Sequence, residues 1–224
     1  MYIKQTHSTS TLLREQYSDE LPHLYTIRTD FQTAGRGQRG HSWHRTEGEN
    51  ITFTVVLTPS FLPIIEQFRL SEIVALALVD TMAHYGITCR IKWTNDIYAG
   101  DNKIAGILIE HSLSGESIAR TIVGIGLNIN QQIFPDDIPN PTSMSLERGI
   151  TFNREEILNH YISALNDLYT MLQQGKKEDI ESRYIATMYH LGEKHTYAYP
   201  TGEEFQATIR GVRPTGHLFL EHTD

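Results

Sequence analysis

The chain has 224 residues, and its 19 Lys plus Arg against 27 Asp plus Glu give a formal net charge of −8. This length favours one medium domain followed by a small one, and the acidic balance argues against a protein that binds duplex DNA by neutralising phosphates. The single cysteine, Cys89, cannot form an internal disulfide, and the sequence shows neither a signal core nor an apolar run of the roughly 20 residues that cross a bilayer. We therefore expect a cytoplasmic protein that binds neither DNA nor a membrane.

The first part of the chain predicts one short helix and two strands. The helix should span about 9–17 with Thr9 or Ser10 as its cap, because Ser and Thr side chains accept hydrogen bonds from the free amides of a first turn. Strand-like runs follow at 24–29 and 51–57. The glycine-rich segment between them therefore lies inside a domain and does not link two domains.

The middle of the chain predicts a buried helix and a sheet. Apolar residues at spacings of three and four cover most of a helix over 69–86, and Gly86 ends it. Strands are expected at 88–93, 103–111 and 118–125, joined by the turns A-G-D-N and S-G-E. Three strands linked by hairpins predict a partly antiparallel sheet.

The last part predicts a loop, two helices and a small β domain. Three prolines make 131–142 a long loop over the end of the sheet. Asn153 and Glu156 form a capping box for an amphipathic helix that should pack on the sheet, and a second helix covers about 178–189. Strand-like runs separated by two P-T-G turns begin near Gly192.

The segment F-Q-T-A-G-R-G-Q-R-G-H-S-W, at 31–43, has the composition of a binding loop. Its glycines let the backbone close on a ligand, while Arg36 and Arg39 offer fixed positive charge to an anion. Taken alone, the segment fits a solvated linker or an RNA-binding tract equally well. Its single occurrence between two strands favours a positioned loop.

A second polar group surrounds the predicted hairpin K-W-T-N-D-I-Y-A-G-D-N-K. It contains Lys92, Asn95, Asp96 and Lys103. Lysines at strand ends suit a phosphate, and Asn and Asp at the bend can fix the loop or hold a metal-bound phosphate, although spacing alone also fits an ordinary hairpin with solvated lysines. The G-I-G at 124–126 predicts a bulge or close packing, because no helix follows as a dinucleotide site requires.

Histidines give a weaker signal. Of the 11 histidines, His41 and His44 are the only pair close together in the sequence, and no acidic partner sits in register with them. The sequence therefore argues against a protein zinc site and identifies no protein ligand for any metal.

In combination, G-R-G-Q-R-G-H-S-W, K-W-T-N-D with K-I-A-G-I-L-I-E, and G-I-G-L-N-I-N resemble the signature set of biotin protein ligases, also called biotin–acetyl-CoA-carboxylase ligases. T-H-S-T-S-T near the start and T-S-M-S-L-E after the proline-rich loop extend the resemblance, which covers residues 6 to about 220. Each motif is weak alone, but their order and separations are specific.

The resemblance implies an α+β fold with a mixed, largely antiparallel sheet, of the type shared with class II aminoacyl-tRNA synthetases. We expect a catalytic biotin- and ATP-binding domain over 1–190 and an SH3-like barrel over 191–224. The same resemblance implies an ATP-dependent enzyme that makes biotinyl-5′-AMP from biotin and MgATP. The enzyme then passes biotin to a lysine of a biotin carboxyl carrier protein.

The family's functional positions map onto this sequence in three groups. Lys92 and Arg36 are expected to be the catalytic cations. Biotin should be bound by Ser8, Thr9, Ser10, Gln32, Gly35, Arg36, Gly37, Gln38, Lys92 and Gly106. ATP and the adenylate should be bound by Arg36, Arg39, Trp43, Asn95, Asp96, Lys103 and Asn128.

Several positions depart from the family's pattern. Ser10 replaces an asparagine, Thr94 a proline, and Gln38 and His41 two arginines. The neutral Gln38 predicts looser retention of biotinyl-5′-AMP, because a charged donor binds a phosphate more strongly than an amide does. The chain also stops at 224, where the family usually continues, so that either the barrel is incomplete or a tail is missing.

Three other functions are compatible with parts of this pattern. A lipoate or octanoate ligase shares the fold and differs in its acyl pocket. A biotin-responsive repressor is disfavoured, because the S-T segment begins at residue 8 and leaves no room for a preceding DNA-binding domain. A non-catalytic biotin-binding module would have no use for Lys92 and Arg36. The sequence leaves the carrier's identity and the oligomeric state, including a homodimer, open.

Overall fold

The computed structural model describes residues 1–16, 21–35, 37 and 46–222. Its strands are β1 (Tyr2–Thr6), β2 (Thr26–Gln32), β3 (Ile51–Leu57), β4 (Cys89–Lys92), β5 (Asp96–Ala99), β6 (Asn102–Ser114), β7 (Ser117–Leu127), β8 (Lys194–Ala198), β9 (Glu204–Val212) and β10 (Leu218–His222). Its helices are α1 (Thr9–Gln16), the short 3-10 helix η2 (Ile64–Glu66), α2 (Phe68–His84), α3 (Met144–Arg148), α4 (Arg154–Gln173) and α5 (Lys177–Ala186).

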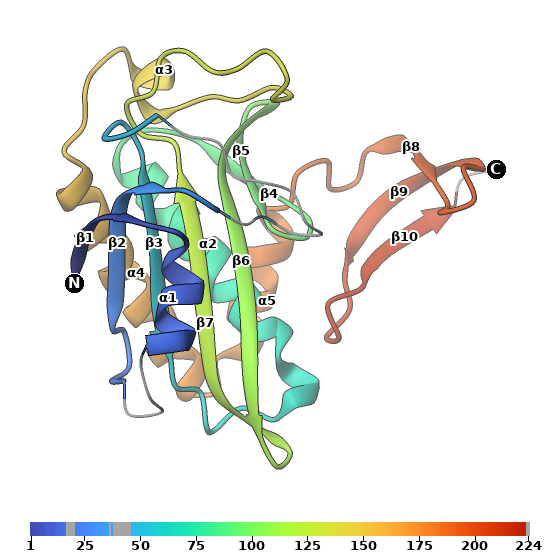
Figure 1. Cartoon of the computed structure of the whole chain (residues 1–224). Coiled ribbons are helices and arrows are strands. Elements are labelled where there is room, and N and C mark those ends of the chain that lie inside the picture. The colour runs from blue at the N-terminus through green and yellow to red at the C-terminus, as the bar shows by residue number, and fades with distance from the viewer. Residues whose placement is uncertain (17–20, 36, 38–45, 223–224) are drawn as a thin grey trace.

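The strands form two sheets (Figure 1). One has seven strands in the order β1-β2-β3-β7-β6-β5-β4, and the other has three in the order β10-β9-β8. β1 runs parallel to β2, and the other neighbouring strands of both sheets run antiparallel. The predicted α+β class with a mixed, largely antiparallel sheet is confirmed.

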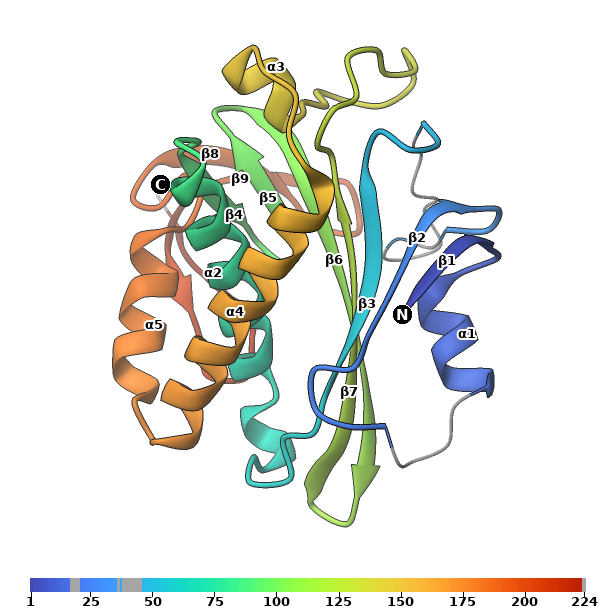
Figure 2. The same cartoon turned by 90° about the vertical axis from the view of Figure 1, so that its left-hand side faces the viewer.

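Helices cover the two faces of the large sheet unequally (Figure 2). α2, α4 and α5 lie on one face, and α1 lies on the other. The main core fills the first side, where Phe53 of β3 meets the ring of Tyr161 on α4 with centroids 5.3 Å apart. A smaller cluster under α1 contains Leu12, Leu13, Ile27, Val56 and Ile122. All seven residues of β3 are buried because helices pack against both of its faces.

The helix caps follow the expected chemistry with one shift. Asn153 caps α4 as predicted, since its side chain accepts hydrogen bonds from the backbone amides of Glu155 and Glu156. The predicted cap of α1 at Thr9 or Ser10 is wrong. Ser8 takes this position, because its Oγ accepts from the Thr11 amide at 3.4 Å and Thr9 is already helical.

The sequence prediction missed two strands. β1 has no clear alternation and forms because it pairs with β2. β5 follows the W-T-N bend directly, so that the expected three-stranded unit has four strands, and Asp96 begins a strand instead of occupying a bend. Short strands of four or five residues carry too little periodicity to be recognised alone.

The C-terminal part of the chain is joined to the large sheet at its edge strand β4. The Trp93 indole, just after β4, donates to the carbonyl of Gly216 at 2.9 Å, and the Ile91 amide of β4 donates to the carbonyl of Thr187, just after α5, at 2.9 Å. Within the C-terminal part, the Gly192 amide donates to the carbonyl of Ile209 on β9 at 2.9 Å. Residues 194–222 form three antiparallel strands, and a closed barrel is not present among the residues that the structure describes.

Within 1–16, 21–35, 37 and 46–222, no helix combines the length and apolar character that a membrane span requires.

Gly216→Ala should weaken the contact between the sheets. Gly216 has φ +87°, and an added Cβ would lie 2.6 Å from Cδ2 of Phe68. Gly202 is the matched control, since it has φ +88° and no atom within 4 Å of an added Cβ. We expect Gly216→Ala to lower the free energy of unfolding by about 1–3 kcal/mol more than Gly202→Ala in urea denaturation. Equal losses would show that Phe68 does not restrict this site.

Candidate functional site

A row of small and polar residues crosses one face of the large sheet. Successive strand pairings join Thr52 to Gly126, Gly126 to Gly106, Gly106 to Asp96, and Asp96 to Lys92. Residues directly opposite each other in a sheet point to the same face. The row therefore has two glycines at its centre, where the sheet presents bare backbone, and a lysine at its end.

This is the face that α1 covers. Gly124 lies two residues before Gly126, and a Cβ added to Gly124 would be 2.8 Å from Oγ of Ser10 on α1. The G-I-G motif thus serves close approach, as predicted, since any side chain at 124 would push α1 away from the sheet.

A buried chain of hydrogen bonds links α1 to β2 and β3. The Thr54 hydroxyl donates to Oγ1 of Thr9 at 2.7 Å, and the Thr9 hydroxyl donates to Oε1 of Gln32 at 3.0 Å. Because Thr54 uses its proton on Thr9, the Ser10 hydroxyl is the donor in its 3.0 Å contact with Thr54. All four side chains are at least nine-tenths buried.

Gln32 accepts the last hydrogen bond of this series. Its Oε1 also accepts from the backbone amide of Thr9 at 2.6 Å. These two bonds turn the carbonyl oxygen of Gln32 towards α1, so the orientation of its amide is fixed by Thr9. The structure therefore brings the predicted residues Ser8, Thr9, Ser10 and Gln32 together. It adds Thr54, which belongs to none of the recognised motifs.

At the other end of the row, Lys92 contacts two tyrosines. Its Nζ donates to the hydroxyl of Tyr98 at 3.1 Å and lies 4.6 Å and 6.0 Å from the ring centroids of Tyr98 and Tyr189. Burial, together with a 2.7 Å hydrogen bond to Asp101, raises the pKa of Tyr189 to about 12. Tyr189 therefore stays protonated and donates to Asp101. Neither tyrosine was a predicted site residue.

The remaining hairpin residues divide between the two faces. Lys103 pairs with Asp96 at 2.7 Å between Nζ and Oδ1. Asn95 instead donates to the Ile107 carbonyl at 2.9 Å and accepts from the Thr94 hydroxyl at 3.2 Å. It lines a cleft of about 310 Å³ beside the start of α2, away from the row. Asn95 thus braces the hairpin, as one of the two sequence interpretations expected.

Asn128 lies just after β7 and is 4% exposed. Its backbone amide donates to Ile104 and its Nδ2 donates to Thr142, each at 2.9 Å. Within the described residues its Oδ1 is buried and has no hydrogen-bond partner. A buried acceptor without a partner costs about 1–3 kcal/mol, so this atom is a candidate for contact with a ligand donor.

Of the glycine-rich segment at 31–43, the structure describes residues 31–35 and 37. The predicted site residues Arg36, Gln38, Arg39 and Trp43 lie outside the described residues, and Gly35 and Gly37 lie within them. Near the start of the segment, the Ala34 amide donates to the carbonyl of His7 at 2.8 Å, beside Ser8. After it, the Thr46 amide donates to Oε1 of Gln131 at 3.3 Å. Both ends are therefore attached close to the row of small and polar residues.

Comparison with known proteins identifies the family. The model of the biotin/lipoate A/B protein ligase family matches residues 2–128, more than half of the chain. The chain belongs to this family.

Relatives within the biotin/lipoate ligase family differ in length. The biotin–[acetyl-CoA-carboxylase] ligase of Paracoccus denitrificans is 32% identical over 200 residues, which cover 84% of this chain and 80% of the relative. The bifunctional ligase/repressor BirA of Bacillus spizizenii is 33% identical over 173 residues, which cover 75% of this chain. The chain spans only 53% of the length of that repressor.

Solved structures agree on the fold of the family. A biotin protein ligase from Aquifex aeolicus in complex with biotin and ATP superposes with a TM-score of 0.82 at 23% identity, covering 100% of this chain and 95% of its own. A biotin protein ligase from Leishmania major in complex with biotinyl-5-AMP gives 0.70 at 23% identity, covering 100% and 94%.

Other histidines come close in space although they lie further apart in the sequence than His41 and His44. His190 and His195 have ring centroids 3.9 Å apart, and those of His84 and His160 are 4.0 Å apart. The first pair is five residues apart in sequence and includes Glu193 between its members, a spacing that could have drawn attention to it. His41 and His44 themselves lie outside the described residues.

Thr54→Val should destabilise the protein at almost unchanged volume. The substitution leaves the hydroxyls of Ser10 and Thr9 each without one partner in a buried position, which should cost about 1–3 kcal/mol in the free energy of unfolding. Urea denaturation measures this loss. In the Ser10→Ala background, Thr54→Val should lower the free energy of unfolding by less, because the Ser10 hydroxyl that would lose its partner is already absent. Equal costs in both backgrounds would contradict the hydrogen-bonded chain.

Proposed function

We propose that this chain is a biotin protein ligase. It activates biotin with MgATP to biotinyl-5′-AMP and transfers biotin to one lysine of a biotin carboxyl carrier protein. The observation that carries the proposal is the single face on which a buried polar group, bare glycine backbone and Lys92 follow one another. The relatives named as biotin ligases support it.

The polar group around Thr9, Gln32 and Thr54 suits the ureido head of biotin, which offers N–H donors and a carbonyl acceptor. A site built to hydrogen-bond such groups rejects an analogue that lacks them by about 10⁴ to 10⁵. Gly106 and Gly126 then leave space for the apolar acyl chain to lie against the sheet. In this order the biotin carboxylate would lie near Lys92.

Lys92 would serve the adenylation step. A carboxylate oxygen attacks the α-phosphorus of ATP, a new C(O)O–P bond forms, and the bond to pyrophosphate breaks with both electrons leaving on pyrophosphate. The Lys92 ammonium offsets the repulsion between the two anions and the charge that grows between them. The hydrogen bond to Tyr98 keeps the Lys92 ammonium beside the row before biotin and ATP bind. A carboxylate or phosphate oxygen would then replace Tyr98 as the acceptor.

The adenine would lie at the loop that follows β7. The buried Oδ1 of Asn128 can accept from the exocyclic amine of adenine. Lys103 is close to this point, because its carbonyl accepts from the Thr142 amide while Nδ2 of Asn128 donates to the Thr142 carbonyl. The α-phosphate would then fall between Asn128 and Lys92.

The row offers Mg²⁺ one carboxylate ligand. Asp96 is the carboxylate on the row, and it is already paired with Lys103. Mg²⁺ commonly takes one or two carboxylates and completes its shell with water and phosphate oxygens, so Asp96 with the ATP phosphates is sufficient. When bound, Mg²⁺ would neutralise phosphate charge.

The second half-reaction delivers biotin to the carrier. The neutral amine of the carrier lysine attacks the acyl carbon of biotinyl-5′-AMP, and AMP leaves with the bonding electrons. Residues 1–190 would supply this chemistry, and residues 191–224 would correspond to the SH3-like part of such ligases. With a net charge of −8, we propose no role for DNA as a partner. A homodimer remains open.

Pyrophosphate exchange tests the function. We expect the chain to exchange labelled pyrophosphate into ATP when biotin is present, and at least about 10²-fold less when lipoate or octanoate replaces it. Exchange that depends on lipoate and not on biotin would make the chain a lipoate ligase. Biotin binding without exchange would make it a non-catalytic binding module, and both results contradict the proposal.

Lys92→Ala should lower the rate of biotinyl-5′-AMP formation by about 10²-fold or more while the fold survives, because Lys92 is exposed and serves developing charge. Arg90→Ala is the matched control. Arg90 is a cation on the same strand and face, and it donates to the Ala186 carbonyl at 2.9 Å. Single-turnover formation of the adenylate measures both variants, and near-normal activity of Lys92→Ala would remove it from the mechanism.

A further inference from the structure

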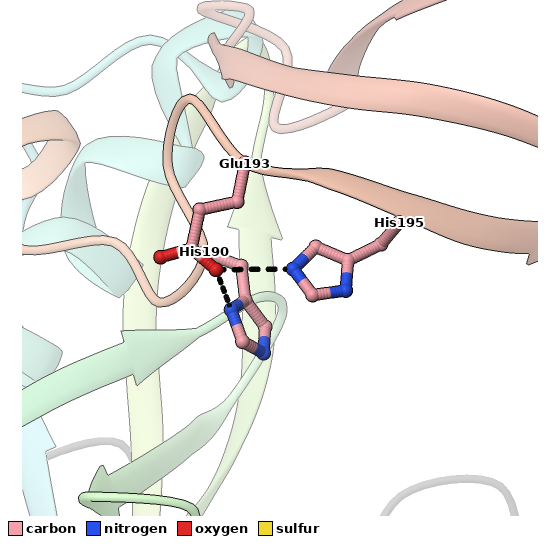
Figure 3. A group of neighbouring side chains, drawn as sticks. All are labelled: His190, Glu193 and His195. Atoms are coloured by element: carbon pink, nitrogen blue, oxygen red, sulfur yellow. Dashed lines mark hydrogen bonds and ion pairs between the residues drawn. The ribbon is translucent and has the colours of Figure 1, made fainter.

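Three side chains converge at the start of the small sheet (Figure 3). Glu193 Oε2 lies 2.5 Å from Nδ1 of His190 and 3.1 Å from Nε2 of His195. One ligand atom from each residue lies within 4.8 Å of the other two. Each histidine ring turns one nitrogen towards the same carboxylate oxygen. The function proposed above makes no use of this cluster.

The backbone fixes two of these side chains in place. His190 has φ +58°, a left-handed conformation that non-glycine residues seldom adopt. The bend is held by the Glu193 amide, which donates to the His190 carbonyl at 3.2 Å, and by the Gly192 amide, which donates to Ile209. His195 is the second residue of β8 and pairs with Ala207 of β9. The two rings therefore come from separately anchored segments.

The donor set is one that transition metals prefer. Two imidazole nitrogens and one carboxylate oxygen, with water as a fourth ligand, form a common zinc site. With zinc–ligand bonds of about 2.0–2.1 Å, the ligand atoms of a tetrahedral site lie roughly 3.3 Å apart. The observed 3.1 Å is close to this spacing, whereas the observed 2.5 Å is shorter and would have to lengthen when an ion binds. The Glu193 side chain is 61% exposed and can rotate to complete it.

We propose that His190, Glu193 and His195 bind one divalent transition-metal ion of the zinc class. This ion would tie the bend at 190–193 to β8, at the junction between the two sheets. The inference is independent of the ligase function, because it concerns binding of the metal alone.

The ion would also stabilise the surroundings of Lys92. The ring of His190 lies 3.7 Å from that of Tyr189, and Tyr189 lies 5.2 Å from Tyr98, the partner of the Lys92 ammonium. Fixing His190 in one orientation limits the movement of this aromatic series. The metal thus has a structural role and takes no part in the reaction.

Metal titration tests the proposal on the full chain without a polyhistidine tag, after treatment with a chelator. Zn²⁺ binding is measured by calorimetry, and Co²⁺ binding by its visible ligand-field absorption, in the absence of ATP and biotin. We expect one ion per chain at this site. Loss of an outer-shell partner alone costs 10–100-fold in metal affinity, so loss of a direct ligand should cost at least about 100-fold.

The variants are chosen to keep the fold. Asn tolerates the left-handed conformation, so His190→Asn suits position 190. Glu193→Gln preserves size, and His195→Gln retains an amide nitrogen about as far along the side chain as Nε2. His217→Asn is the matched control, because His217 is exposed in the turn between β9 and β10 and hydrogen-bonds only locally, to Thr215 at 2.9 Å.

The outcomes separate a metal site from a plain ion-pair cluster. Binding that is lost in the three cluster variants and kept in His217→Asn supports the site. No binding by the parent chain would show that the two histidines and Glu193 only pair with one another. Binding that persists in all three variants would place the ion elsewhere. Each of the last two results overturns the proposal.

Discussion

The register between β3, β7 and β6 is the constraint on which the rest of the site depends. It places Thr54 opposite Gly124, and Thr52, Gly126 and Gly106 side by side. Since side chains alternate between the faces of a sheet, the same register sends Phe53, Ile125 and Ile107 into the core under α2 and α4. A slip of one residue would bury the polar row and expose the core, so the hydrophobic burial on one face determines where the ligand surface lies on the other.

The large periodic elements were predictable from sequence. The apolar pattern predicted α2, the Asn153 cap predicted α4, and β-branched runs predicted β3 and β7. β1 and β5 were missed because each exists only through pairing with a neighbour. The small sheet was anticipated, but whether three strands close into a barrel depends on long-range pairing that local patterns do not record.

Site residues that belong to a sequence motif could be predicted. Site residues that reach the site only through contacts in the folded chain could not. Thr9 and Gln32 were named because they lie in recognisable segments, and the structure joins them at 3.0 Å. Thr54 and Tyr189 come from an ordinary strand and from a bend near the end of the chain, 45 and 97 residues away from their partners Thr9 and Lys92. No local signal distinguishes them, because their role arises from contacts made only in the folded chain.

Hydrogen bonds at Ala34 and Thr46 fix the chain on either side of the central part of the glycine-rich segment. Ala34 is bonded to His7 and Thr46 to Gln131, so the chain enters and leaves this segment at points that the rest of the fold already holds. Closing a loop between fixed ends costs little more as it lengthens, about 0.6 kcal/mol for a doubling. The length of the segment can therefore change at small cost to stability. In the ligase that we propose, this is a place where evolution, or an engineer, could adjust how long biotinyl-5′-AMP is held without rebuilding the rest of the protein.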